Sequence, residues 1–431
     1  MTDLTVYTEA GAAFFDGRDP YVVSNVRGWR YVYPPLFAIL LAPLHPLDTR
    51  LQALIWFLIS CGFACGVFVE VRRMLRYVVE KGLLGGRGGG APPAWIIGPA
   101  GFVAVLAALA ALQRGQVDLM ISYALWLGLR MVWTGKAWPA WLFGGILLAV
   151  PVSIKLTPVV AVGFLCLQLA LLALRRREGR PRALGVSSGL ALGMALWLFI
   201  APSLLVGWRA NVGYLVSWRD RVALVAAADR PSGGMDRRSY RNQSLSNAAY
   251  RFGNYVAYEL GRGPDDRLAS DTLPRGTMPM DHPAFSKALD VVRGLLLLAL
   301  LLAGLRLTLR RELGGLAAFG LACSATLLVS PVSWPYHHVL WLPALLFVPL
   351  WLYGEGRDRA AAAMAWIPCG LVIAHAALFS VAGRLGLQGL GHAAWFVAAV
   401  ALAVSGRACK RTDSHVAVSQ ELKGECRSRR K

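Results

Sequence analysis

The chain has 431 residues, of which 56% are hydrophobic and only 16% are charged, with a formal net charge of +21. A soluble protein of this size would carry about 25% charged residues, and here charge is missing from long blocks rather than thinned evenly. This distribution excludes an ordinary soluble domain and is typical of a polytopic membrane protein. Because the Lys and Arg residues lie in short loops between apolar runs, we expect them to contact membrane lipids and not nucleic acid.

The N-terminal segment 1–49 is predicted to lie outside the membrane. Its short apolar helix, 34–44, is about half as long as a membrane is thick. If this helix crossed the membrane, every later loop would lie on the side opposite to the one that its charge predicts. We therefore place the helix at the outer interface. No apolar span comes before it in the sequence, and we therefore expect that a first transmembrane helix is missing ahead of Met1.

Eleven later apolar runs are predicted to be transmembrane helices, although several are shorter than the roughly 20 residues that a spanning helix usually needs. We expect them to form one all-α membrane bundle over residues 1–406. The predicted spans are 50–72, 95–112, 117–133, 138–150, 157–174, 183–206, 286–309, 313–330, 337–354, 361–382 and 391–406.

Positive charge sets the predicted orientation of these helices. Basic residues cluster after the first, fifth, seventh, ninth and last predicted spans. The positive-inside rule places those loops, and the polar, basic and disordered tail 407–431, in the cytoplasm. Because successive loops lie on alternate sides of the membrane, four segments are left outside: 1–49, 207–285, 331–336 and 383–390.

Three polar clusters fall in these outer segments. They surround Asp3, the stretch 241–244, and the link 330–340, which carries the adjacent histidines His337 and His338. Lipid offers hydrogen-bonding groups no partners, so we predict that the clusters meet in one water-facing active site.

Each polar residue also has a structural explanation. Lys155 could extend from a helix end to the interface, although an ionisable residue inside a membrane is a candidate for function. Gln116 could satisfy a tight turn between two helices, and Asn242 could cap a loop. The two histidines could be interfacial residues without chemistry, and we expect no zinc site because no third ligand stands at a helical spacing from them.

The order of several short motifs decides between these explanations. The motifs are Asp3 with Tyr7, Gly17-Arg18-Asp19-Pro20-Tyr21, Tyr33-Pro34-Pro35, Gly115-Gln116-Val117-Asp118, Lys155-Leu156-Thr157-Pro158, Arg241-Asn242-Gln243-Ser244-Leu245 and Ser330 to His338. In this order they resemble glycosyltransferase family 87 over about residues 3–345. Members of this family are GT-C-type integral membrane mannosyltransferases that use polyprenyl-phosphate sugars.

The resemblance implies a GT-C-like fold and a role for each polar residue. Asp3 is the expected general base that takes a proton from the acceptor. The donor phosphate is expected to bind Lys155, Arg241 and His338, with support from His337, Asn242, Gln243 and Gln116. It further implies an inverting transfer to a lipid or glycan acceptor on the outer face of the plasma membrane, with the lipid-linked sugar as substrate and no separate cofactor.

A polytopic transporter or lipid flippase is the alternative function. Such proteins often contain inverted repeats and charged residues at mid-membrane, whereas here no two-half symmetry is visible and the polar clusters gather on one face. A non-catalytic scaffold for envelope assembly is a third interpretation.

Overall fold

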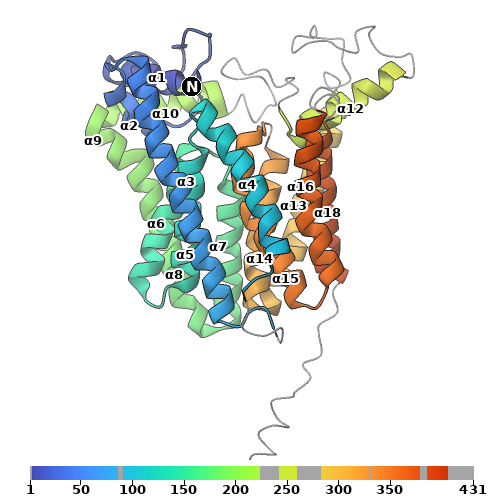
Figure 1. Ribbon diagram of the computed structural model, residues 1–431. Coiled ribbons are helices and arrows are strands. Elements are labelled where there is room, and N and C mark those ends of the chain that lie inside the picture. The colour runs from blue at the N-terminus through green and yellow to red at the C-terminus, as the bar shows by residue number, and fades with distance from the viewer. Residues whose placement is uncertain are drawn as a thin grey trace, which may run out of the picture.

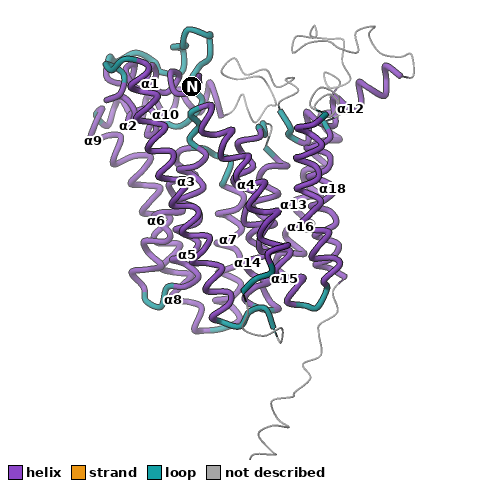
Figure 2. Tube along the Cα trace, in the orientation of Figure 1, coloured by secondary structure: helices purple, strands orange, loops and turns teal. Residues whose placement is uncertain are grey.

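The computed structural model describes residues 2–85, 91–223, 242–259, 283–330, 332–378 and 386–405. Within these ranges every regular element is a helix, and the helices run roughly parallel to one another, with loops at the two ends of the bundle (Figures 1 and 2). Eight helical segments are long and apolar enough to cross a membrane. The predicted all-α polytopic fold is confirmed.

Each of the eleven predicted spans coincides with a helical segment. Three of these helices, α5, α6 and α7, have only 17 residues each, or about 25 Å at 1.5 Å per residue. The segments are α3 (Thr49–Glu80), α4 (Ala94–Arg114), α5 (Asp118–Thr134), α6 (Trp138–Ile154), α7 (Val159–Arg175), α8 (Arg180–Met194) continued by a π-helical turn into α9 (Ala201–Val206), α13 (Pro283–Arg310), α14 (Glu312–Val329), a 3₁₀ helix η6 (Pro335–Trp341) continued by α15 (Leu342–Gly354), α16 (Asp358–Ala377) and α18 (Leu387–Ser405).

Helices α14 and α15 form the centre of the bundle. In the most apolar 18-residue stretch of α14, and in that of the η6–α15 segment, 89% of the residues are buried inside the protein. In the corresponding stretch of α3 only 17% are buried. In Figure 1, α14 and α15 lie in the middle of the bundle, between α5 and α7 on one side and α16 and α18 on the other. Apolar side chains that remain exposed on α3, such as Leu58 and Phe68, suit a lipid environment, where they cost no hydrophobic free energy.

Small residues allow α6 and α8 to approach closely. A Cβ atom added to Gly145 of α6 would overlap the backbone oxygen of Val186, and one added to Gly189 of α8 would overlap the backbone oxygen of Leu142. Packing of this kind replaces the hydrophobic effect as the force that joins helices within lipid.

Four short helices cap one end of the bundle. Helices α1 (Thr2–Phe15), α2 (Pro35–Leu41), α10 (Trp208–Trp218) and α12 (Leu245–Glu259) all lie at this end (Figure 1). The Tyr214 hydroxyl of α10 donates to the Phe14 carbonyl at 3.1 Å, and Trp218 Nε1 donates to the Val32 carbonyl at 3.3 Å. The first 49 residues are therefore joined to α10 by side-chain hydrogen bonds.

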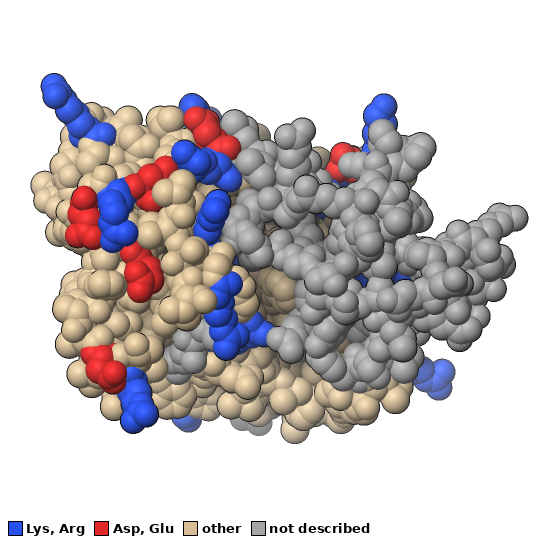
Figure 3. Space-filling view, turned by 90° about the horizontal axis from the view of Figure 1, so that it is seen from above, with Lys and Arg blue, Asp and Glu red and all other residues tan. Residues whose placement is uncertain are grey.

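Charged side chains of both signs lie on this capped end (Figure 3). Arg18 pairs with Asp16 at 2.6 Å and Arg219 with Asp220 at 2.7 Å, and all four side chains are about half exposed. Exposed ion pairs of this kind need water around them. We call this the capped end of the bundle.

Candidate active site

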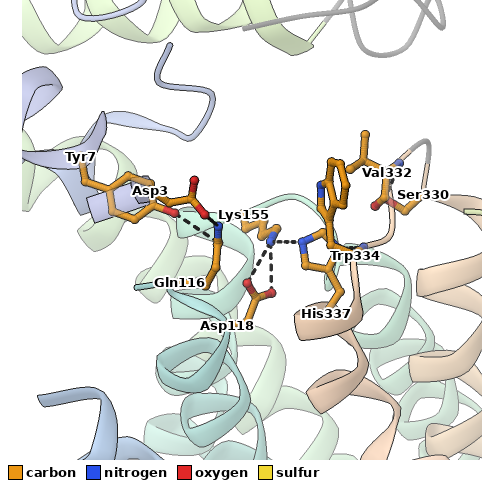
Figure 4. Close-up of polar contacts among 9 residues, drawn as sticks. All are labelled: Asp3, Tyr7, Gln116, Asp118, Lys155, Ser330, Val332, Trp334 and His337. Carbon is orange, nitrogen blue, oxygen red and sulfur yellow. Dashed lines mark hydrogen bonds and ion pairs between the residues drawn. The ribbon is translucent and has the colours of Figure 1, made fainter. Parts of the chain in front are cut away.

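Asp3 lies in the first turn of α1 and is buried. Its Oδ2 atom accepts a hydrogen bond from Gln116 Nε2 (Figure 4). Tyr7 lies one turn further along, on the same face of α1, and donates its hydroxyl to Gln116 Oε1 at 3.2 Å. The nitrogen and the oxygen of the Gln116 side-chain amide thus both bind residues of α1, and they hold α1 against the turn between α4 and α5.

Burial raises the pKa of the Asp3 carboxyl above its ordinary value. The hydrogen bond from Gln116 and the positive charges of Arg114 and Lys155 act in the opposite direction but do not outweigh burial. A carboxylate with a raised pKa accepts a proton more readily than an exposed one. The environment of Asp3 is therefore suited to a general base.

The α4–α5 turn depends on a glycine. Gly115 ends α4 in the left-handed conformation, with φ 74° and ψ 36°, which a residue without Cβ adopts without strain. Trp56 Nε1 donates to the Gly115 carbonyl at 2.9 Å and anchors the turn to α3. Gln116 and Asp118 follow immediately, so one short turn supplies two polar side chains.

Asp118, Lys155 and His337 form a buried polar chain below Asp3. Lys155 follows the last residue of α6, and its Nζ atom lies 3.0 and 3.2 Å from the two carboxylate oxygens of Asp118. The same Nζ lies 2.8 Å from Nε2 of His337. Asp118 is fully buried and Lys155 is 7% exposed, so Lys155 is paired within the bundle and does not extend to the interface.

Aromatic rings enclose the Lys155 ammonium. Its Nζ atom lies 5.4 Å from the ring centroid of Tyr33 and 5.9 Å from that of Tyr336, both within the range of cation–π attraction. The Tyr7 ring lies 5.8 Å from the Tyr33 ring. These rings limit the access of water, which strengthens the electrostatic interactions among the polar groups.

The Asn-Gln-Ser stretch holds the histidine-bearing link in place. Asn242 Oδ1 accepts from the backbone N–H of Ser333 at 3.0 Å and from that of Ser244 at 3.1 Å. The Gln243 N–H donates to the Ser333 carbonyl at 2.6 Å, and Gln243 Oε1 accepts from the N–H of Gly389 in α18 at 3.3 Å. Asn242 and Gln243 thus fix the backbone of the link at Ser333. None of these bonds joins them to Asp3 or Lys155.

The two adjacent histidines point in different directions. His337 faces Lys155, and its Nδ1 accepts from the Trp334 N–H at 3.2 Å. His338 Nδ1 lies 2.8 Å from Gln388 Nε2, and its ring lies 6.1 Å from that of His392, both on α18. The structure therefore brings His337, and not His338, to the Lys155 cluster.

A family model describes most of the bundle. Glycosyltransferase family 87 matches residues 31–331, more than half of the chain. The chain belongs to glycosyltransferase family 87. No curated protein and no solved structure matches it. The protein is accordingly a membrane glycosyltransferase that acts on a sugar donor and an acceptor, and the match gives no support to a transporter, flippase or scaffold.

The glycosyltransferase brings four of the predicted site residues into one cluster: Asp3, Gln116, Lys155 and His337. Asn242 and Gln243 support the cluster indirectly, His338 lies toward α18, and Arg241 lies outside the described residues. The family match begins at Tyr31, so the role of Asp3 stays a prediction from the motif order and the geometry.

Several members of the cluster were not among the predicted site residues. The sequence contained a signal for Asp118, because a lysine between two apolar runs needs a counter-ion and Asp118 lies in a quoted motif. Tyr7, Tyr33 and Tyr336 carried no such signal beyond their place in motifs. Among the described residues, no group of three His, Cys, Asp or Glu side chains is arranged to hold a metal ion.

Proposed function

We propose that this glycosyltransferase transfers a hexose, α-mannose by its resemblance, from a polyprenyl-phosphate sugar to a hydroxyl group of a lipid or glycan acceptor. The observation that carries the proposal is that one short turn, between α4 and α5, binds a buried carboxylate and a buried cation: Gln116 donates to Asp3, and Asp118 pairs with Lys155. A carboxylate and a cation are the two charges that such a transfer requires.

The reaction is a single displacement with inversion at C1 of the hexose. Asp3 takes the proton of the acceptor hydroxyl as its oxygen attacks C1, and the bond between C1 and the phosphate oxygen breaks. The electron pair leaves with polyprenyl phosphate, which needs no proton. One carboxylate is therefore enough, in contrast to the carboxylate pair of glycoside hydrolysis.

Lys155 acts on the leaving phosphate in this proposal, and His337, whose Nε2 lies 2.8 Å from its Nζ, positions the ammonium. Nitrogen-bound protons aimed at a developing charge in a dry site stabilise a transition state more than they do in water. Asp118 balances the lysine before the donor arrives and fixes its position. Arg241 remains a further predicted ligand of the phosphate, whereas His338, also predicted as a ligand, lies against Gln388 of α18.

We propose that the reaction takes place at the outer face of the plasma membrane. The support is that the C-terminal ends of α3 and α7 lie at the end of the bundle opposite α1 (Figure 1); Lys81 directly follows α3, and Arg175 is the last residue of α7. By the positive-inside rule the opposite end is cytoplasmic, and the capped end with Asp3 faces outward. Energy comes from the bond between the sugar and the phosphate of the donor, so the proposal calls for no nucleotide cofactor.

Incubation of the purified protein in detergent with radiolabelled polyprenyl-phosphate-mannose and membrane lipid or glycan acceptors tests this function. We expect label in a product that contains the acceptor, and none when nucleotide-linked mannose replaces the donor. Transfer only from the nucleotide sugar would contradict the proposed donor. A protein that moves the labelled lipid across sealed vesicles, but transfers nothing in detergent, would contradict the proposed reaction.

A further inference from the structure

Trp334 is more exposed than Tyr336, the neighbouring aromatic residue that packs against His337. It lies in the link between α14 and η6 and is half-buried, whereas its neighbours Ser333, Tyr336 and His337 are buried. In Figure 4 its indole ring rises above His337, and the Asp3 carboxyl lies across from it, with Lys155 below and between the two. The ring therefore borders the space in which the proposed reaction occurs.

The indole ring is held in a fixed orientation. It stacks on the Tyr336 ring, with 6.5 Å between centroids and 18° between planes. The backbone that carries the ring is held as well: the backbone N–H of Trp334 donates to His337 Nδ1 at 3.2 Å, and Asn242 and Gln243 hold the preceding Ser333 on both its N–H and its carbonyl. Tryptophans that belong to a membrane interface belt anchor to the headgroups, whereas these contacts tie Trp334 to the active-site histidine.

We propose that Trp334 binds the hexose ring of the lipid-linked donor by stacking. This inference rests on the proposed function, because that function requires C1 of the donor to lie between Asp3, which receives the acceptor proton, and Lys155, which receives the phosphate. The hexose then lies beside the indole. A hexose has one face of C–H groups, and an aromatic ring with a large apolar surface packs against such a face.

The proposal predicts an effect on binding of the donor rather than on the chemical step. Stacking on the sugar exists both before and during transfer, so its loss raises the KM for the donor more than it lowers kcat. We expect Trp334→Leu to raise this KM about tenfold, which corresponds to about 1.4 kcal/mol. Trp334→Phe keeps an aromatic ring and is expected to raise it less than threefold.

Kinetics of the purified variants test the proposal, with polyprenyl phosphate that lacks the sugar as a competitive inhibitor. We expect Trp334→Leu to raise the donor KM and to leave the inhibition constant of polyprenyl phosphate unchanged. Trp208→Leu is the matched control, because Trp208 is 61% exposed on α10 and pairs with Phe199 away from His337. An unchanged donor KM in Trp334→Leu overturns the proposal, and so does an equal weakening of the sugar-free lipid, which would assign the ring to the polyprenyl chain.

Hydroxyl-radical footprinting of the unmodified protein keeps the test open if Trp334→Leu does not fold. We expect polyprenyl-phosphate-hexose to protect Trp334 from oxidation and polyprenyl phosphate not to protect it. Equal protection by both lipids, or by neither, overturns the stacking role. If the unmodified protein transfers no hexose at all, the proposed function itself is wrong. If the protein is active but Trp334 neither affects the donor KM nor is protected by the donor, only the stacking inference is wrong.

Discussion

Nε2 of His337 lies 2.8 Å from Nζ of Lys155, although 182 positions separate the two residues in the chain. With Asp118 they form a buried chain of polar groups that joins α5, the end of α6 and η6. Such a chain inside an apolar bundle stabilises the fold only while all its members are present. It therefore makes both the stability and the activity of the protein sensitive to single substitutions.

Replacement of Asp118 by Asn is expected to destabilise the protein strongly, because it leaves the buried Lys155 ammonium without its counter-charge. Removal of one partner from a buried pair costs about 3–5 kcal/mol. Thermal unfolding in detergent measures the effect. The double variant Asp118→Asn with Lys155→Met is expected to be more stable than Asp118→Asn alone, because it removes the uncompensated charge. Simple additivity of the two single effects would contradict the coupling.

The two adjacent histidines are expected to differ in their effect on catalysis. His337→Gln removes the ring that positions Lys155, and we expect kcat to fall by about 10²-fold, as when a catalytic group is misplaced. His338→Gln alters a contact with α18 and should lower thermal stability more than kcat. Measured kcat values and unfolding temperatures of both variants check this order. A larger loss of kcat in His338→Gln would reverse the assignment.

The activity is expected to follow the protonation of Asp3. Burial raises the pKa of this carboxyl, so kcat/KM should rise with pH through a midpoint above the ~3.9 of an unperturbed aspartate. The hydrogen bond from Gln116 lowers the pKa of Asp3, and Gln116→Leu should therefore move the midpoint to higher pH. A pH profile of the variant that shifts downward, or not at all, would show that Gln116 does not stabilise the carboxylate.

The close packing of α6 against α8 gives a prediction on stability alone. Gly189→Ala places a methyl group against the Leu142 backbone oxygen, and backbone cannot move away cheaply, so we expect a lower unfolding temperature. Gly163→Ala on α7 is the control, because nothing lies within 4 Å of its added Cβ. This control should be neutral or slightly stabilising, since alanine favours helix more than glycine does. Equal unfolding temperatures of the two variants would contradict the described packing.

The sequence allowed the helices to be predicted well and the contacts within the site only in part. Apolar length and charge identified all eleven helical runs, because lipid imposes both on any spanning segment. The pairing of Lys155 with Asp118 depends on how helices are rotated against each other, which no local pattern encodes. The divergence of His337 and His338 depends on the 3₁₀ geometry of η6, in which neighbouring side chains point about 120° apart.

The role of the Asn-Gln-Ser stretch shows the same limit. Its motif order associated Asn242 and Gln243 with the site, and the structure has both bonded to the backbone of Ser333. A polar residue that binds a substrate and one that binds a distant loop look alike in the sequence, because both satisfy hydrogen-bonding groups. Only the fold distinguishes them.

The most direct test of the central claim is the transfer rate of Asp3→Asn with radiolabelled polyprenyl-phosphate-mannose. Asparagine has the same size and still accepts the hydrogen bond from Gln116, but it cannot take a proton from the acceptor. Asp16→Asn is the matched control, because the Asp16 side chain is 55% exposed and pairs with Arg18. We predict that Asp3→Asn folds and binds the donor but loses about 10²–10⁴-fold in kcat, while the control keeps its activity. Turnover of Asp3→Asn at the rate of the unmodified protein would contradict the account.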